Sequence, residues 1–167
     1  MMDIKWTHLE RVLNEFADYF IEEARRNLDE NDTNASYELY NSFETIIDVG
    51  QDYFKVSVSL ADYWKYVENG RGPGRYPPID KIREWVEVKP VSITPGMNGR
   101  TPSVEQVSFL IARKIANEGT EAQPFFEPAK EKAIDRFNDA INEAIMDDVY
   151  DYIDELIIER MKDTFGK

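Results

Sequence analysis

Apolar residues recur at steps of three and four near the start of the chain. They are Leu9, Val12, Leu13, Phe16, Tyr19, Phe20, Ala24 and Leu28. This spacing predicts one amphipathic helix, which the polar run from Asn31 to Asn34 ends. Thr7 and Glu10 stand three residues apart before the run and predict a capping box at the helix start.

The same period returns at the end of the chain and predicts one long helix that begins at Glu127 and that nothing interrupts before Gly166. Its apolar positions are Ala133, Phe137, Ala140, Ile141, Ala144, Ile145, Val149, Tyr152, Ile153, Leu156, Ile157 and Met161. Roughly 38 helical residues would span about 57 Å, which is longer than a domain of this size is wide. We therefore expect either a kink near Asp147 and Asp148, or packing of the far end against a neighbouring chain.

Between these helices the period changes to two. Phe43, Thr45, Ile47 and Val49 alternate with other residues, as do Phe54, Val56, Val58 and Leu60. With Gly50 to Asp52 as the turn, the pattern predicts a β-hairpin with one buried face. Two strands alone are marginal in water, so we expect a third strand, a covering helix or a strand from another subunit. Residues 36–43 show no pattern that decides their structure.

Short elements are predicted from residue 62 onward. Residues 62–69 predict a helix that Gly70 ends in the left-handed conformation. A second short helix follows Pro77 and Pro78, the prolines and glycines of 89–100 predict a mobile loop, and Thr101 and Pro102 cap a helix that ends at Gly119. The expected class is α+β, with an N-terminal helix, a small antiparallel hairpin or sheet, short helices and a long C-terminal helix.

Length and composition fit one domain over 1–167, because 167 residues with 42% hydrophobic content suffice for a core. The chain has no cysteine, which excludes disulfides and thiolate chemistry. No leader pattern and no apolar run of bilayer length are visible. We expect a protein made in the cytoplasm, with no cofactor and no membrane partner.

The net charge of −13 is unevenly distributed. Residues 1–54, 55–118 and 119–167 carry about −9, +3 and −7. Such a balance speaks against general or sequence-specific nucleic-acid binding, which needs clustered basic residues. Either the acidic helix faces are simply solvated, or the basic middle of one copy meets the acidic helices of the next.

Candidate catalytic chemistry is sparse. His8 is the single histidine and is expected at a surface or capping position, so nucleophilic triads are excluded as local motifs. Asp147, Asp151, Asp154 and Glu155 share a predicted helix face that a divalent cation could use. They lack the glycine turn of a calcium loop, so a solvated face is the favoured interpretation and no enzyme is expected.

The loop Gly70-Arg71-Gly72-Pro73-Gly74-Arg75 only superficially resembles a phosphate cradle, because it lacks the Gly-Lys-Ser/Thr ending. We interpret it as a turn whose arginines are solvated or pair with carboxylates of another subunit. The candidate partner or oligomer contacts are Arg71, Arg75, Tyr76 and Arg100. In the later segment Pro124 to Ala129, two prolines fix the placement of Phe125 and Phe126, which we expect to pin the last helix to the sheet.

Three motifs in this order resemble the small head-to-tail joining proteins of tailed bacteriophages, called neck, head–tail connector or tail-completion proteins. The motifs are Leu39 to Phe43 (Leu-x-x-Ser before a strand), Tyr63 to Gly70 (Tyr-x-x-Tyr-Val-Glu-x-Gly) and Gly119 to Ala129 (Gly-Thr-x-x-x-Pro-Phe-φ-x-Pro-Ala). The resemblance covers residues 39–133. Arg71 and Glu127 depart from it, where the family often has threonine and a basic residue.

The resemblance implies a non-enzymatic virion protein that forms a ring homo-oligomer at the head–tail junction. Its partners would be a portal or head-completion adaptor on one side and a tail tube or tail terminator protein on the other. The expected structural anchors are Tyr63, Tyr66, Glu68, Gly70, Gly119, Pro124, Phe125, Phe126 and Pro128. An acidic ring lumen would offer passing DNA no counter-charges. The alternatives are a tail terminator ring protein, a small acidic adaptor or inhibitor of a basic partner, and a carboxylate metal enzyme.

Overall fold

The computed structural model describes residues 3–31, 37–89 and 101–165. The chain divides into two compact units, each assembled from separate segments. The first unit comprises residues 1–24, 44–59 and 127–167, and the second comprises 25–43 and 60–126. The single domain expected over 1–167 stays a prediction.

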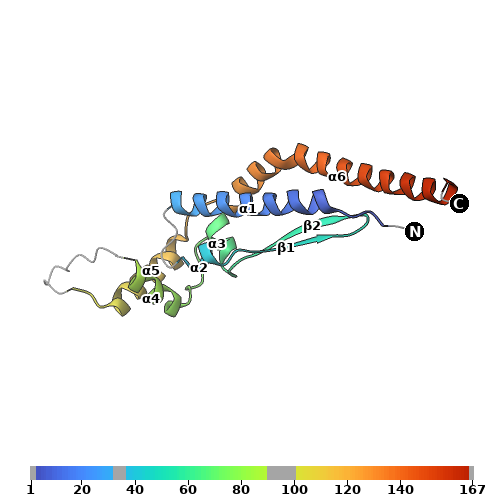
Figure 1. Ribbon diagram of the computed structural model, residues 1–167. Coiled ribbons are helices and arrows are strands. Elements are labelled where there is room, and N and C mark those ends of the chain that lie inside the picture. The colour runs from blue at the N-terminus through green and yellow to red at the C-terminus, as the bar shows by residue number, and fades with distance from the viewer. Residues whose placement is uncertain (1–2, 32–36, 90–100, 166–167) are drawn as a thin grey trace. The chain divides into compact units, whose positions relative to one another are not determined.

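The elements follow one another as the α+β prediction has them (Figure 1). They are α1 (Thr7–Glu30), α2 (Glu38–Asn41), β1 (Glu44–Val49), β2 (Phe54–Ser59), α3 (Trp64–Asn69), α4 (Ile79–Val88), α5 (Val104–Glu118) and α6 (Phe126–Phe165). The previously unassigned segment contains α2, a single turn of helix. Among the described residues, no helix has both the length and the apolar character that crossing a membrane requires.

In the first unit, α1 and α6 pack antiparallel. The ring centroids of Phe16 and Phe137 lie 5.9 Å apart, edge to face. Near the other end of the contact, Lys132 forms a 3.1 Å ion pair with the buried Glu23. The apolar α1 side chains that are buried in this unit are Leu9, Val12, Leu13, Ala17, Phe20 and Ala24, which confirms the predicted apolar face.

The hairpin has the predicted strands, which pair antiparallel with Glu44 opposite Ser59 and Val49 opposite Phe54. In β1, Thr45, Ile47 and Val49 are partly buried and the residues between them are exposed. Thr45 and Ile47 line a small pocket together with Glu10 and Asn14 of α1. Of the expected supports for this two-stranded sheet, a covering helix is therefore the one that the described residues supply.

Two of the predicted helix caps, those of α1 and α5, need correction. The Thr7–Glu10 capping box is wrong, because the backbone N–H of Glu10 donates to the carbonyl of Trp6 at 3.0 Å. At α5, the cap is Ser103 rather than Thr101 and Pro102. Ser103 forms a reciprocal capping box with Gln106, three residues on. The hydroxyl of a serine at this position can accept a hydrogen bond from a backbone N–H. A proline side chain has no atom that could do so.

In the second unit α4 packs on α5, and the unit has its own set of buried apolar side chains, from the end of α1, α2, α4, α5 and the segments that join them. These are Leu28, Leu39, Phe43, Val86, Val107, Ala112, Ala116 and Phe125. Arg25 of α1 holds α2 in place through two contacts with Tyr40. Its Nε donates to the Tyr40 carbonyl at 3.0 Å, and its guanidinium group lies over the Tyr40 ring.

The long helix α6 spans 40 residues, as predicted to within a few positions. Figure 1 shows it curving along its length, although it contains no glycine or proline beyond its first turn. Its last turns leave Ile157, Ile158 and Met161 more than half exposed. Packing of this end against a neighbouring chain stays a prediction.

Candidate functional site

A buried carboxylate in α3 joins two motifs that are distant in the sequence. One carboxylate oxygen of Glu68 accepts the backbone N–H groups of Phe125 and Phe126, both at 2.8 Å. Phe126 is the first residue of α6. The N–H groups in the first turn of a helix have no acceptor within that helix. A negative charge is favourable at this positive end of the helix dipole. Glu68 is only 8% exposed, and these two bonds compensate for its burial.

Aromatic packing completes this junction, which we call the Glu68 junction (Glu68, Trp64, Phe43, Phe125 and Phe126). Phe125 is fully buried and meets Phe43 edge to face, with 6.3 Å between centroids. The ring centroids of Phe126 and Trp64 lie 5.0 Å apart. The described contacts attach both phenylalanines to α3 and Phe43 within the second unit. The expectation that they pin the last helix to the sheet stays a prediction.

The last turns of α1 also hold the approach to this junction. The side-chain amide of Asn27 donates to the Phe125 carbonyl at 3.0 Å, and that of Asn31 donates to the Pro124 carbonyl at 3.3 Å. Pro128 stands in the first turn of α6, where its missing N–H breaks no helical bond. Pro124 therefore lies just before α6, and Pro128 lies in its first turn.

Two glycines allow the neighbouring chain segments to approach. Arg71 and Thr120 exchange backbone hydrogen bonds of 2.9 and 2.7 Å, and Gly70 and Gly119 precede them. Gly70 has φ +68° and ψ −171°, so the predicted positive φ is confirmed but ψ is extended rather than helical. Gly119 ends α5 as predicted, and its backbone conformation resembles that of Gly70, with φ +82°. A Cβ atom on Gly70 would lie 2.5 Å from the Thr120 carbonyl oxygen, and one on Gly119 would lie closer still to that of Arg71.

The candidate partner contacts lie on the loop that follows. The Arg71 guanidinium donates to the Arg75 carbonyl and so stabilises the loop internally. The N–H of Gly74 donates to the Ala116 carbonyl at 2.7 Å, which ties the loop to α5. Arg75 is exposed, whereas Arg100 and the 90–100 segment lie outside the described residues.

The tyrosines of the motifs differ in their surroundings. Tyr76 is 48% exposed and stacks on Phe109 of α5, with 6.3 Å between the ring centroids. Tyr63 is 36% exposed, and the desolvation of its hydroxyl raises its pKa. Tyr66 is 62% exposed, which does not fit the anchor role expected for it.

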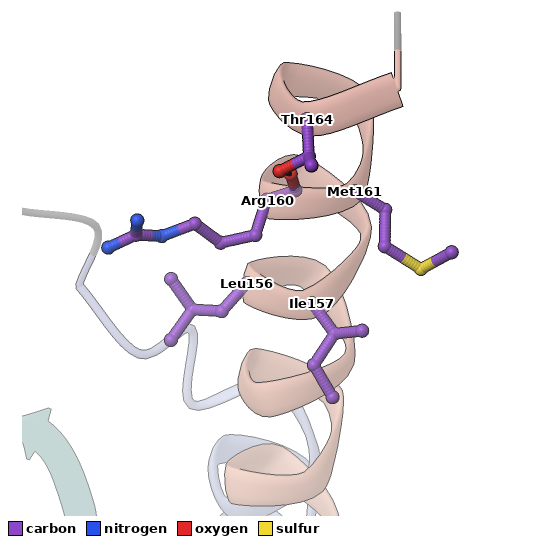
Figure 2. Close-up of a pocket in the computed structure, with 5 residues that line it drawn as sticks. All are labelled: Leu156, Ile157, Arg160, Met161 and Thr164. Carbon is purple, nitrogen blue, oxygen red and sulfur yellow. Dashed lines mark hydrogen bonds between the residues drawn. The ribbon is translucent and has the colours of Figure 1, made fainter.

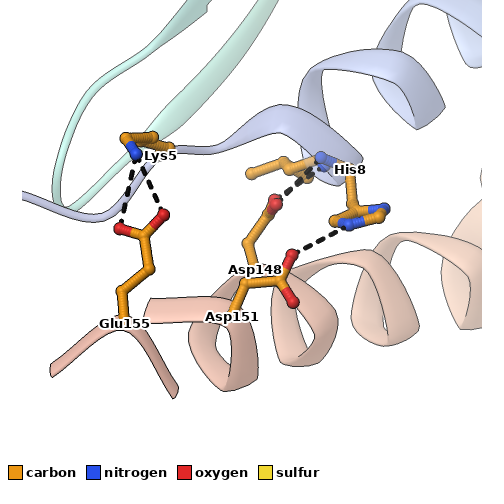
Figure 3. Close-up of polar contacts among 6 residues, drawn as sticks. Lys5, His8, Asp148, Asp151 and Glu155 are labelled. Atoms are coloured by element: carbon orange, nitrogen blue, oxygen red, sulfur yellow. Dashed lines mark hydrogen bonds and ion pairs between the residues drawn. The ribbon is translucent and has the colours of Figure 1, made fainter. Parts of the chain in front are cut away.

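A second junction was not predicted. Asp148 of α6 is 2% exposed, and its two oxygens accept the N–H groups of His8 and Leu9, each at 2.9 Å (Figure 3). This carboxylate replaces the expected capping box at the start of α1. Its position four residues after the buried Ala144 places it on the buried side of α6. That spacing was the available signal in the sequence.

Two of the four carboxylates proposed as a metal site, Asp151 and Glu155, have structural partners (Figure 3). Asp151 lies 3.3 Å from the His8 Nε2 atom, and Glu155 forms a 3.0 Å ion pair with Lys5. Within the ranges that the structure describes, no group of three or more histidine or carboxylate side chains is arranged to hold a metal ion. His8 is partly exposed in the first turn of α1, close to the capping position expected for it.

The C-terminal turns of α6 carry an open pocket of about 300 Å³ (Figure 2). Leu156, Ile157, Arg160, Met161 and Thr164 line it. Figure 2 shows the Ile157 and Met161 side chains projecting away from the helix axis. Its lining is mainly apolar and contains no carboxylate or histidine, which fits a contact surface better than a catalytic site.

No protein-family model matches the chain, and searches among curated proteins and solved structures found no significant similarity. Function is therefore inferred from the residues and surfaces described above.

Proposed function

We propose that this protein is a structural, non-enzymatic subunit of a tailed-bacteriophage virion. It forms a ring at the head–tail junction and joins the portal or its adaptor to the tail. The observation that carries the proposal is the Glu68 junction. Its two hydrogen bonds connect the Tyr63–Gly70 motif with the Gly119–Ala129 motif, which are the segments that resemble phage joining proteins.

The contacts of the ionisable residues support a structural role. Asp148 caps α1, Asp151 pairs with His8, and Glu155 pairs with Lys5. Asp151 and Glu155, two of the four carboxylates considered for metal chemistry, and His8, the one candidate base, thus all take part in contacts between α6 and the N-terminal segment. A ring subunit needs such rigid junctions because its interfaces must repeat with the same geometry around the ring.

The proposed partners follow from this role. A portal or head-completion adaptor contacts one side of the ring, and a tail tube or tail terminator protein contacts the other. The subunit is made in the host cytoplasm and resides in the virion. The acidic charge of −13 favours a lumen that does not retain DNA, because phosphates meet few basic groups there.

Deleting the gene from the phage that encodes the chain tests the proposal. We expect DNA-filled heads and finished tails that do not join, as seen by electron microscopy. A plasmid copy should restore joined virions, and so should the exposed-site control Glu84→Ala. Glu68→Ala, which breaks the Glu68 junction, should not. Virions of normal appearance after deletion would contradict the proposal.

The same experiment separates the two alternatives. Loss of a tail terminator would give tails of irregular length rather than unjoined ones. An acidic adaptor or inhibitor, which the net charge of −13 also favours, would be absent from purified virions. It would instead bind a basic partner with an affinity that falls steeply as salt increases.

A further inference from the structure

An exposed apolar stripe runs along the second half of α6. It comprises Met146, Tyr150, Ile153, Ile157 and Met161, each between 43% and 58% exposed. Steps of four, three, four and four residues place these side chains on one side of the helix, within an arc of about 80°. The buried Ala144 and Asp148 lie on the opposite side, against α1. We call this surface the α6 stripe.

Acidic residues border the α6 stripe. Glu143, Asp147 and Asp154 are exposed, and helical geometry places all three along one edge of it. Figure 2 shows its last members, Ile157 and Met161, projecting from the helix. A continuous apolar surface of this kind on a helix is typical of a protein contact rather than of a solvated face. This acidic edge favours a partner with positive charge, whereas the opposite edge carries the exposed Arg160.

A second exposed apolar surface lies in the other unit. Phe109 and Leu110 of α5 are 48% and 55% exposed, and Tyr76 stacks on Phe109. Arg113 follows them by four and three residues, so it shares their side of α5. Arg75, the neighbour of Tyr76, is also exposed. We call these five residues the α5 patch.

We propose that the α6 stripe of one copy binds the α5 patch of a second copy. Both surfaces expose large apolar side chains, and the acidic edge of the α6 stripe is opposite in charge to the two arginines of the α5 patch. Two α6 stripes facing each other would place carboxylates against carboxylates, which costs free energy. Arg75 and Arg113 of the α5 patch instead meet Glu143, Asp147 and Asp154.

This contact uses two different surfaces of the same chain, so it is heterologous. Each bound copy leaves one surface available for the next, and the assembly closes into a ring when the rotation between copies divides a full turn. The inference rests on the proposed function in that it names the subunit interface of the proposed ring.

Mixing two singly blocked variants tests this arrangement. The stripe variant carries Ile153→Glu and Ile157→Glu, and the patch variant carries Phe109→Glu and Leu110→Glu. Ile134→Glu and Val88→Glu are matched controls, because Ile134 and Val88 are similarly exposed, at 47% and 56%, but lie outside both surfaces. Circular dichroism checks that every variant is folded, and sedimentation velocity measures association.

We expect the wild type and both controls to associate. Each blocked variant alone should associate at least ~100-fold more weakly. Their equimolar mixture should form a dimer and stop there, since the stripe variant keeps its patch and the patch variant keeps its stripe. In a second arm, Arg75→Glu with Arg113→Glu should weaken association, and a partner with Asp147→Lys and Asp154→Lys should restore it.

Three outcomes would overturn the inference. If the stripe variant is monomeric while the patch variant assembles like the wild type, the α6 stripe pairs with itself. If both variants assemble fully, another surface makes the contact, and the proposed function is unaffected. A wild type that does not associate also overturns the inference, whereas the gene deletion decides the proposed function independently.

Discussion

The Oδ2 atom of Asp148 accepts the backbone N–H of Leu9 at 2.9 Å, and Oδ1 does the same for His8. One buried carboxylate in the middle of α6 thereby satisfies two of the four N–H groups that lack partners at the start of α1. The charge also lies at the positive end of the α1 dipole, which offsets its burial. Asp148 therefore links the two long helices of the first unit at a fixed register.

Replacing Asp148 by alanine should lower the free energy of unfolding by roughly 1–3 kcal/mol, because two buried N–H groups lose their acceptor. Asp148→Asn should cost less, since an amide oxygen still accepts one bond. Chemical denaturation measures both. The exposed neighbour Asp147 supplies the control, for which Asp147→Ala should stay within about 0.5 kcal/mol of the wild type. Equal effects at 147 and 148 would contradict the capping role.

The glycines around the Arg71–Thr120 pair should tolerate no side chain. Gly70→Ala and Gly119→Ala each place a Cβ against a backbone carbonyl oxygen at a positive φ, so we expect a loss of more than about 1 kcal/mol for each. Gly72→Ala is the matched control, because a Cβ there meets nothing within 4 Å. A thermal melt in which all three variants behave alike would show that the close approach of these segments is not required.

Phe125 and Phe126 should differ in their contribution to stability. Phe125 is fully buried, so Phe125→Ala should cost about 3–5 kcal/mol. Phe126 is only partly buried, and Phe126→Ala should cost clearly less. Unfolding in urea compares the two. An unchanged melting temperature after both replacements would refute the anchor role of this pair.

Tyr53 provides a test by pH. Its hydroxyl donates to Asp48 at 3.0 Å, and that hydrogen bond, together with the charge of Asp48, raises the pKa of Tyr53 above its ordinary 10.0. The neutral phenol is therefore favoured in the folded state. The contribution of this bond to stability is complete below pH 10.0 and is lost as the pH rises through the raised pKa.

Asp48→Asn should return the pKa of Tyr53 towards 10.0. Asp52→Asn should have a smaller effect, because Asp52 acts on the pKa of Tyr53 by charge alone and is the weakest cause of its shift. An NMR titration of a labelled Tyr53 distinguishes the two variants. A pKa that does not respond to Asp48→Asn would contradict the hydrogen bond at the hairpin turn.

The elements were predictable because their signals are local. The 3.6-residue period of α1 and α6 and the alternation in β1 follow from which side chains face the core of their own unit. Gly119 as the end of α5 was likewise readable from the sequence. These signals need no knowledge of what lies across the interface.

The partners of buried polar groups were not predictable, because they depend on tertiary contacts. Thr7 and Glu10 match a capping box, yet Asp148, which lies 139 residues after Leu9, supplies the acceptor instead. Glu68 was recognised only as part of a motif, and its bonds to Phe125 and Phe126 appear only when α3 meets the start of α6. Tyr66 belongs to the same motif as Glu68, but its side chain is largely exposed to solvent.

The central claim is that copies of this chain assemble with one another through surfaces of opposite charge. The most direct measurement is the solution mass of the purified wild-type protein by light scattering, over a wide concentration range at low and high salt. We expect a mass several times the 19.5 kDa of one chain, which rises with concentration and falls at high salt. A mass of 19.5 kDa under every condition would contradict the claim.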